Sequence, residues 1–233
     1  MHKIFDNKDY IYFDMGNTLL DFHQGLTDDQ KDLIGLNNMS SYLESLGIKI
    51  SANECKSKFL DVLYSKFHLR EAELIEIDVY EILRTFLDLR ADQEDQLLKA
   101  FYRPYGDYIN VHDGALDLLK VLKEQKKYIG IVSNCFLPAF IYQEIFKETG
   151  LDDYIEDYTF SYTYKIRKPN PELFKYAFKK PYEKCLMIGD GFKPDILGSN
   201  QLGVDSIWYN HKKRRQETAK HLKLTIESLR ELI

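Results

Sequence analysis

The segment YIYFDMGNTL, residues 10–19, passes from four apolar or aromatic residues directly into a carboxylate, Asp14. A second segment, CLMIGDGFKPD at residues 185–195, follows the same plan with Asp190 and Asp195. Short apolar runs of this kind predict buried strands of a parallel sheet, and open α/β sheets bind ligands at the carboxyl ends of such strands. Three carboxylates at the edge of a core are costly unless a cation compensates them. The simplest site that meets this need is one for magnesium-assisted phosphoryl transfer.

Strand and helix patterns alternate through the second half of the chain. We expect strands at residues 128–132, 158–162, 185–188 and 206–209, and helices at 115–126, 138–148, 171–179 and 194–202. In the first of these helices Leu116, Leu119 and Leu122 are expected to face inward. Such alternation predicts an α/β fold in which helices on both faces cover a parallel sheet. The opening strand belongs to this sheet.

The segment from about residue 24 to 108 has a different character, with many charges and no strong strand pattern. Its apolar residues recur at helical spacing, as in Leu33, Leu36, Tyr42, Leu43 and Leu46 before Gly47. We therefore predict two domains. Residues 22–108 form an all-helical insertion, and residues 1–21 together with 109–233 form the α/β core.

The bulk properties are those of an ordinary globular protein. Of the 233 residues 44% are hydrophobic, and the net charge of −5 argues against an extended nucleic-acid surface. The basic cluster HKKRR at residues 211–215 is the exception. We interpret it as a solvated loop after the last strand.

The cysteines and the apolar runs bear on the compartment. Cys55, Cys135 and Cys185 are few, odd in number and widely spaced, which suits a reducing compartment and offers neither a disulfide framework nor a zinc pattern. Cys135 is interpreted as a buried small hydrophobe. No segment approaches the ~20 apolar residues of a membrane span. We expect a cytoplasmic protein without a membrane partner, either monomeric or homodimeric.

The polar residues at the predicted strand ends can be assigned chemical parts. Asp14 would attack phosphorus once a cation relieves its repulsion with the phosphate, and Mg²⁺, which prefers hard oxygen ligands, suits this task. Asp190 is the natural second ligand. Lys168 would neutralise the phosphate oxygens, and the Ser133 hydroxyl would donate to one of them.

Four motifs of the chain resemble those of the haloacid dehalogenase-like hydrolase superfamily, in particular its phosphatases. They are residues 14–18, residues 131–134 with Ser133 and Asn134, residues 167–171 with Lys168, and residues 188–198 with Asp190 and Asp195. The resemblance covers nearly the whole chain. It implies a Rossmann-like core and, in the segment after the first motif, a helical cap that closes over the site and selects the substrate.

The same resemblance implies roles for the site residues. Asp14 would be the nucleophile, and Asp14, Asp190 and the Gly16 carbonyl would hold Mg²⁺. Asp195 would support the metal waters or orient Lys168. The phosphate of a small phosphorylated metabolite would be held by Ser133, Asn134, Lys168 and the backbone amides of Met15 and Gly16.

One position departs from the family's phosphatases, which usually carry a second aspartate two residues after the nucleophile. In this chain that position is Gly16, which has no side chain to transfer a proton. General acid–base help is worth about 10²- to 10⁴-fold in rate. Three hypotheses follow. The substrate has a good leaving group, as in sugar 1-phosphates, acyl phosphates or aryl phosphates; another group supplies the proton; or the site binds phosphate with little turnover.

Two further hypotheses belong to other classes of function. One is a phosphate-ligand binding or regulatory protein. The other is a metal-independent 2-haloacid dehalogenase, but that reaction does not explain the acidic pair Asp190 and Asp195, and the family's dehalogenases have a tyrosine where Gly16 stands. The sequence favours a magnesium-dependent phosphatase.

Overall fold

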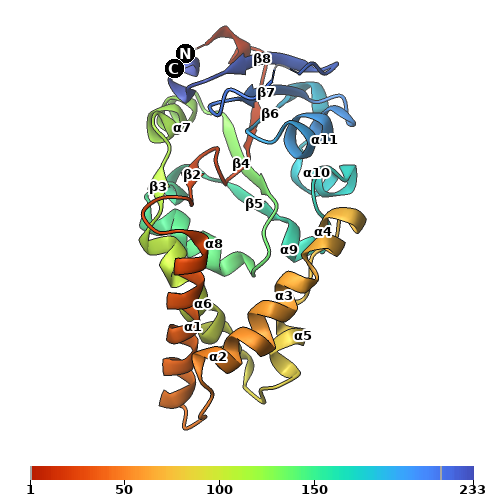
Figure 1. The fold of residues 1–233 in the computed structure, drawn as a ribbon. Coiled ribbons are helices and arrows are strands. Elements are labelled where there is room, and N and C mark those ends of the chain that lie inside the picture. Colours follow the sequence, from red (N-terminus) through yellow and green to blue (C-terminus); the bar gives the residue numbers. More distant parts are fainter. Residues whose placement is uncertain (1, 216) are drawn as a thin grey trace.

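A computed structural model describes residues 2–215 and 217–233. Figure 1 shows an elongated molecule with a sheet at one end and a group of helices at the other. Both chain termini lie at the sheet end, close to the outermost strand.

A six-stranded parallel sheet forms the core. Its strands are β1 (Tyr10–Phe13), β4 (Tyr128–Ser133), β5 (Asp157–Phe160), β6 (Cys185–Gly189), β7 (Asp205–Tyr209) and β8 (Leu222–Ile226). Their order across the sheet is β5-β4-β1-β6-β7-β8, and every neighbouring pair is parallel. The chain moves outward from β1 to β5 in one direction and then returns to the other side of β1 with β6. In open α/β sheets a ligand crevice forms where the strand order reverses in this way, which is here between β1 and β6.

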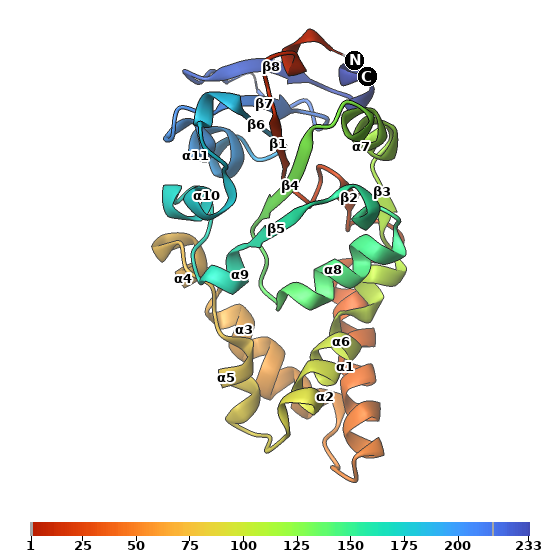
Figure 2. The same ribbon diagram turned by 180° about the vertical axis from the view of Figure 1, so that it is seen from behind.

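Helices cover both faces of the sheet (Figure 2). They are α7 (Ala115–Glu124), α8 (Ala139–Glu148), α9 (Ser161–Tyr164), α10 (Pro171–Ala177) and α11 (Gly198–Asn200). Side chains of β1 alternate between the faces: Ile11 and Phe13 belong to the apolar cluster that includes α7 and α8, and Tyr12 belongs to the cluster that includes α10. The predicted fold class, an α/β fold in which helices on both faces cover a parallel sheet, is confirmed.

Six α-helices and a π-helix over Lys56–Leu60 form the helical segment between β2 (Leu20–Asp21) and β3 (Asn110–Val111), which is called the helical cap below. The α-helices are α1 (Asp28–Ser45), α2 (Ala52–Cys55), α3 (Asp61–Ser65), α4 (Phe67–Glu73), α5 (Val79–Arg84) and α6 (Ala91–Asp107). A two-stranded antiparallel ribbon, β2 with β3, joins the two ends of this segment. Helix α1 packs along α6, and α4 returns to the sheet end near α9 (Figure 1). The domain boundaries at residues 21/22 and 108/109 stay a prediction.

Several elements differ from the expectations. The strand expected at residues 158–162 ends at Phe160, where α9 begins, and the helix expected at 194–202 is a π-helix over Phe192–Leu197 that continues into α11. The strand β8 was not expected, so residues 211–215 do not follow the last strand. Leu116 was expected to face inward but is 39% exposed, because Leu118 occupies the buried face of α7 instead. Leu33 likewise lies on the outer side of α1, 59% exposed.

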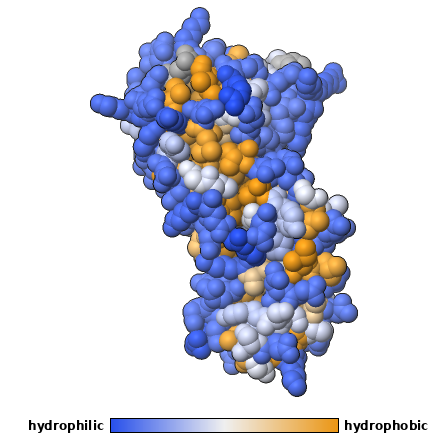
Figure 3. Space-filling model, turned by 90° about the vertical axis from the view of Figure 1, so that its left-hand side faces the viewer, coloured by the Kyte–Doolittle hydropathy of each residue, from blue (hydrophilic) through white to orange (hydrophobic). Residues whose placement is uncertain are grey.

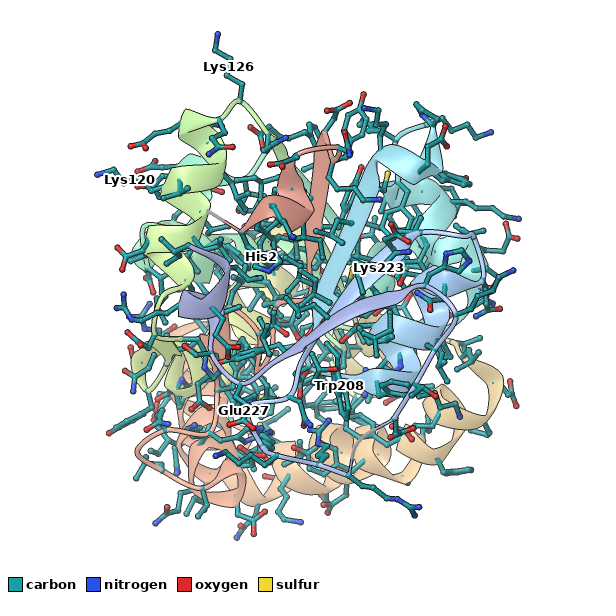
Figure 4. All side chains as sticks on the ribbon, turned by 90° about the horizontal axis from the view of Figure 1, so that it is seen from above. His2, Lys120, Lys126, Trp208, Lys223 and Glu227 are labelled. Carbon is teal, nitrogen blue, oxygen red and sulfur yellow. The ribbon has the colours of Figure 1, made fainter. Side chains whose placement is uncertain are left out.

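The side of the molecule drawn in Figure 3 is mainly hydrophilic, with a broken band of apolar residues along its middle. Seen from above, Lys120 and Lys126 project outward, whereas Trp208 lies among the inner side chains and is fully buried (Figure 4). In the part of the chain that the structure describes, no helix is long and apolar enough to cross a membrane.

Candidate active site

Asp14 follows the end of β1 at the centre of the sheet. Asp14 is buried, with 8% of the residue exposed. Asn17 adopts the left-handed conformation, with φ of 56°, which asparagine tolerates better than most residues. The resulting turn places the Thr18 hydroxyl 3.5 Å from Asp14 Oδ2 and lets the same hydroxyl accept the backbone N–H of Asp190 at 3.0 Å. A threonine of the first motif thus links the ends of β1 and β6.

Lys168 lies at the centre of the polar contacts. Its Nζ donates to Asp14 Oδ1 at 2.7 Å, to Asp195 Oδ1 at 2.6 Å and to the Val132 carbonyl at 2.7 Å, and only 2% of its side chain is exposed. The Asn134 side chain fixes the backbone of Lys168, because it accepts the lysine N–H at 2.8 Å and donates to the lysine carbonyl at 3.1 Å. Burial opposes the charge of Lys168, but the two carboxylates outweigh it and raise the pKa of the lysine. The ammonium group is therefore charged.

The position of Lys168 along the chain differs from the expectation. We expected it at a strand end, but β5 ends at Phe160, and Lys168 lies in the loop between α9 and α10. Its side chain still reaches the ends of the central strands.

Three carboxylates gather around this lysine. One oxygen of each of Asp14, Asp190 and Asp195 lies within 4.8 Å of the other two, and all three residues are buried. Burial and the nearby Asp14 raise the pKa of Asp190 to about 6. Burial also raises the pKa of Asp195, against the neighbouring Lys168. The Asp190 and Asp195 carboxyls therefore resist ionisation in the absence of further positive charge. Together with Asp14 they fit a divalent cation with oxygen ligands.

Ser133 and the glycines complete the polar end of the site. The Ser133 hydroxyl donates to Asp14 Oδ1 at 2.9 Å. A Cβ built on Gly189 would lie 2.4 Å from the Asp195 carboxylate, so only glycine lets Asp195 approach β6 this closely. The Gly191 N–H donates to Asp195 Oδ2 at 2.8 Å and orients that carboxylate.

Sequence reasoning missed two partners of Asp190. Arg214, which we interpreted as part of a solvated basic loop, donates to the Asp190 carbonyl at 3.0 Å and to its Oδ2 at 3.2 Å. The Trp208 indole N–H donates to the same carbonyl at 3.0 Å. The 45% exposure of the Arg214 side chain shows that the solvated-loop interpretation holds only in part. Nothing in the sequence of these five basic and imidazole residues distinguishes Arg214, the one that reaches the site.

A cavity of about 270 Å³ opens onto these residues. Met15, Gly16, Asn17, Ser133, Asn134 and the four charged residues line its polar end, and the other lining residues are Phe22, Tyr102, Phe136, Tyr142, Gly191 and Pro194. The structure therefore brings together every residue to which the sequence assigned a part in the reaction. Cys135 is buried, as expected, and burial raises the pKa of its thiol.

The helical cap also contacts the core beside Lys168. The Glu76 carboxylate is fully buried and accepts from Arg70 at 2.7 Å, from Arg167 at 2.8 Å and from the Ser161 hydroxyl. The backbone N–H of Arg167 donates to the Leu74 carbonyl at 2.8 Å. Arg70 and Glu76 belong to the cap, and Ser161 and Arg167 to the core, so a buried ionic network joins the two.

Comparison with known proteins identifies the family. A family model described as haloacid dehalogenase-like hydrolase matches residues 8–203. The chain therefore belongs to the haloacid dehalogenase-like hydrolases. The resemblance based on the four motifs is confirmed.

Individual relatives are more distant. The chain is 31% identical to the pyrimidine 5'-nucleotidase YjjG of Escherichia coli over 59% of this chain and 61% of that protein. It is 27% identical to the pyrimidine 5'-nucleotidase PynA of Streptococcus pneumoniae over 86% and 83% of the two chains. The match spans 61% and 48% of the first curated relatives, less than two thirds of their length.

The fold recurs in solved structures. The magnesium-bound HAD-hydrolase YfnB of Bacillus subtilis matches with a TM-score of 0.59 and 23% identity, over 97% of this chain and 96% of that one. At this identity the match concerns the fold.

Proposed function

We propose that this protein is a Mg²⁺-dependent phosphatase that hydrolyses a small phosphate monoester through an aspartyl-phosphate intermediate. The observation that carries the proposal is the approach of Asp14, Asp190 and Asp195 to within 4.8 Å around one buried lysine. The names of the relatives, two pyrimidine 5'-nucleotidases and a glyceraldehyde 3-phosphate phosphatase of Pyrococcus furiosus, support the same reaction class.

Each residue has a part in this reaction. Asp14 attacks phosphorus with a carboxylate oxygen, and Ser133 turns its hydroxyl from Asp14 to a phosphate oxygen. Lys168 neutralises negative charge on the phosphate. Asp195 and Asn134 keep Lys168 in place. Backbone amides of Met15 and Gly16 add donors where charge develops.

The cation would be held by Asp14, Asp190 and the Gly16 carbonyl, with Asp195 supporting its waters. When bound, Mg²⁺ supplies positive charge that offsets repulsion between the nucleophile and the phosphate. The three aspartates and Lys168 fit this ion, because three carboxylates share only one lysine and a cation would balance the remaining negative charge.

A phosphate-release assay tests the proposal. Acetyl phosphate is incubated with the protein and Mg²⁺ or EDTA, and released phosphate is measured. We expect release that needs Mg²⁺ and that falls to the level without enzyme in Asp14→Asn. The matched control Asp205→Asn removes a carboxylate at the start of β7, paired with Lys8 at 2.9 Å, and is expected to keep activity.

Other outcomes select the competing hypotheses. Failure to release phosphate, together with thermal stabilisation by inorganic phosphate, would favour a binding or regulatory protein. Release of halide from a short 2-haloacid in EDTA would favour a dehalogenase.

A further inference from the structure

The cavity that contains Asp14 has an aromatic end as well as a polar end. Its aromatic walls are Phe22, Tyr102, Phe136 and Tyr142, from the loop after β2, helix α6, the loop after β4 and helix α8. Tyr102 and Tyr142 are 5% and 2% exposed, whereas Phe22 and Phe136 are half-buried. Phe22 and Phe136 therefore keep ring surface free beside the site.

This aromatic end is held in place by its neighbours. The Tyr102 ring meets Phe136 and Tyr142 edge to face, with centroids 5.9 Å and 5.3 Å apart. The backbone of Phe22 is held by Lys31, whose Nζ donates to the Phe22 carbonyl at 2.5 Å. A pocket with fixed walls costs little ordering when a ligand enters.

The position beside the nucleophile faces an aromatic ring. A Cβ built on Gly16 would meet nothing closer than the Phe22 ring, at 3.8 Å and 3.9 Å. At the position of the family's usual acid, this chain therefore has the Phe22 ring within 4 Å and no side chain of its own that could donate a proton. A leaving group that departs without a proton needs a low pKa, and a phenol near 10, as in tyrosine, leaves far more readily than an alcohol whose pKa approaches the ~15.7 of water.

We propose that the substrate is a small aryl phosphate, in which a single aromatic ring carries the phosphate oxygen directly. This inference rests on the phosphatase function proposed above. The ring packs against Phe22 and Phe136 while the phosphate lies at Asp14. The cavity of about 270 Å³ is near the ~300 Å³ lower end of ligand pockets, which suits one ring.

The reaction balances without another reactant. An oxygen of Asp14 bonds to phosphorus as the bond from phosphorus to the aryl oxygen breaks, and the phenolate leaves with the electron pair. Water then attacks phosphorus, the bond to Asp14 breaks, and inorganic phosphate leaves. The proton given up by water balances the proton that the phenolate takes from solvent.

The first test compares four substrates on the intact protein with Mg²⁺: phenyl phosphate, acetyl phosphate, glycerol 2-phosphate and uridine 5'-monophosphate. We expect kcat/KM for phenyl phosphate to exceed the values for the two alkyl phosphates by about 10²-fold or more, the scale of the missing acid catalysis. A higher kcat/KM for the nucleotide or for glycerol 2-phosphate would overturn the inference.

The second test asks whether the Phe22 and Phe136 side chains contribute to binding the aromatic ring of the substrate. In Phe22→Leu and Phe136→Leu we expect KM for phenyl phosphate to rise about three- to tenfold more than KM for acetyl phosphate, the size of one aromatic contact. Phe140→Leu, on α8 but outside this cavity, should leave that ratio unchanged. Equal changes for both substrates in all three variants would refute the inference.

The acetyl phosphate measurements separate the two proposals. If wild-type protein hydrolyses acetyl phosphate with Mg²⁺ but shows no preference for phenyl phosphate, the phosphatase stands and the aryl substrate fails. If it hydrolyses neither substrate, both fail. Because the substrate comparison uses wild-type protein, it remains decisive even where a leucine variant does not fold.

Discussion

Replacement of Lys168 by methionine is expected to destabilise the protein strongly. The substitution keeps an unbranched side chain of similar length but removes the charge. In the folded chain the ammonium group lies 2.7 Å from Asp14 Oδ1 and 2.6 Å from Asp195 Oδ1, and these carboxylates are 11% and 1% exposed. Removing one partner of a buried ion pair costs about 3–5 kcal/mol, because the remaining charge is left uncompensated.

This cost converts into a measurable change of melting temperature. For a chain of this size 1 kcal/mol corresponds to about 2–4 °C, so Tm should fall by about 6–20 °C. The measurement is thermal unfolding followed by circular dichroism at pH 7 in EDTA. Lys175→Met is the matched control: that lysine is 49% exposed and pairs with Glu172 on the surface, so its loss should cost no more than about 1 kcal/mol.

A double variant identifies the cause. In the double variant Lys168→Met, Asp195→Asn, one of the two unpaired carboxylates is removed. The asparagine at position 195 still offers a side-chain oxygen to the Gly191 N–H. The double variant should therefore be more stable than the sum of the single effects predicts, by about 1–3 kcal/mol. The reasoning is refuted if Lys168→Met melts within about 2 °C of wild type, or if the two single effects simply add.

Three further perturbations address other parts of the structure. Gly16→Asp should raise kcat for glycerol 2-phosphate by about 10²-fold in a phosphate-release assay, because it restores a proton donor; an unchanged rate would mean that another group already delivers the proton. Glu76→Gln should lower the free energy of unfolding, measured in urea, by about 3–5 kcal/mol, because it removes the buried carboxylate that pairs with two arginines. A loss below about 1 kcal/mol would contradict this. Burial lowers the pKa of His211 to about 4, below the ~6.5 of an unfolded chain, so the unfolded state binds more protons between these values and stability falls as the pH falls through that window. Tm should drop from pH 7 to pH 5 by less in His211→Asn than in wild type, and an equal drop in both proteins would argue against it.

The sheet was predictable where its strands are buried on both faces. In β1, β4, β6 and β7 nearly every residue is buried, so the sequence shows uninterrupted apolar runs that point to strands. The edge strand β8 has one buried residue in five and exposes Lys223, so its sequence does not differ from that of a loop. The two-residue strands β2 and β3 are too short to leave any pattern.

The site was predictable to the extent that strand ends determine it. Asp14, Ser133 and Asp190 are placed by the sheet alone, because parallel strands end at one edge. Arg214 depends on a local turn: the Asn210 side chain accepts the Arg214 N–H at 2.9 Å and donates to the Arg214 carbonyl at 3.0 Å. No spacing in the sequence distinguishes this arginine from its basic neighbours, so its contact with Asp190 required three-dimensional information.

The helical cap approaches the site from two sides, and the two contacts have different consequences. Through Phe22 and Tyr102 it supplies walls of the cavity. Through Glu76 it forms an ion pair with Arg167, the residue next to Lys168. Asn134 fixes the backbone of Lys168 to the core, so Arg167 and Lys168 form a continuous link of two residues from the buried Glu76 of the cap to Asp14 of the core. The cap and the charged groups around Asp14 are therefore connected through the backbone as well as through the walls of the cavity.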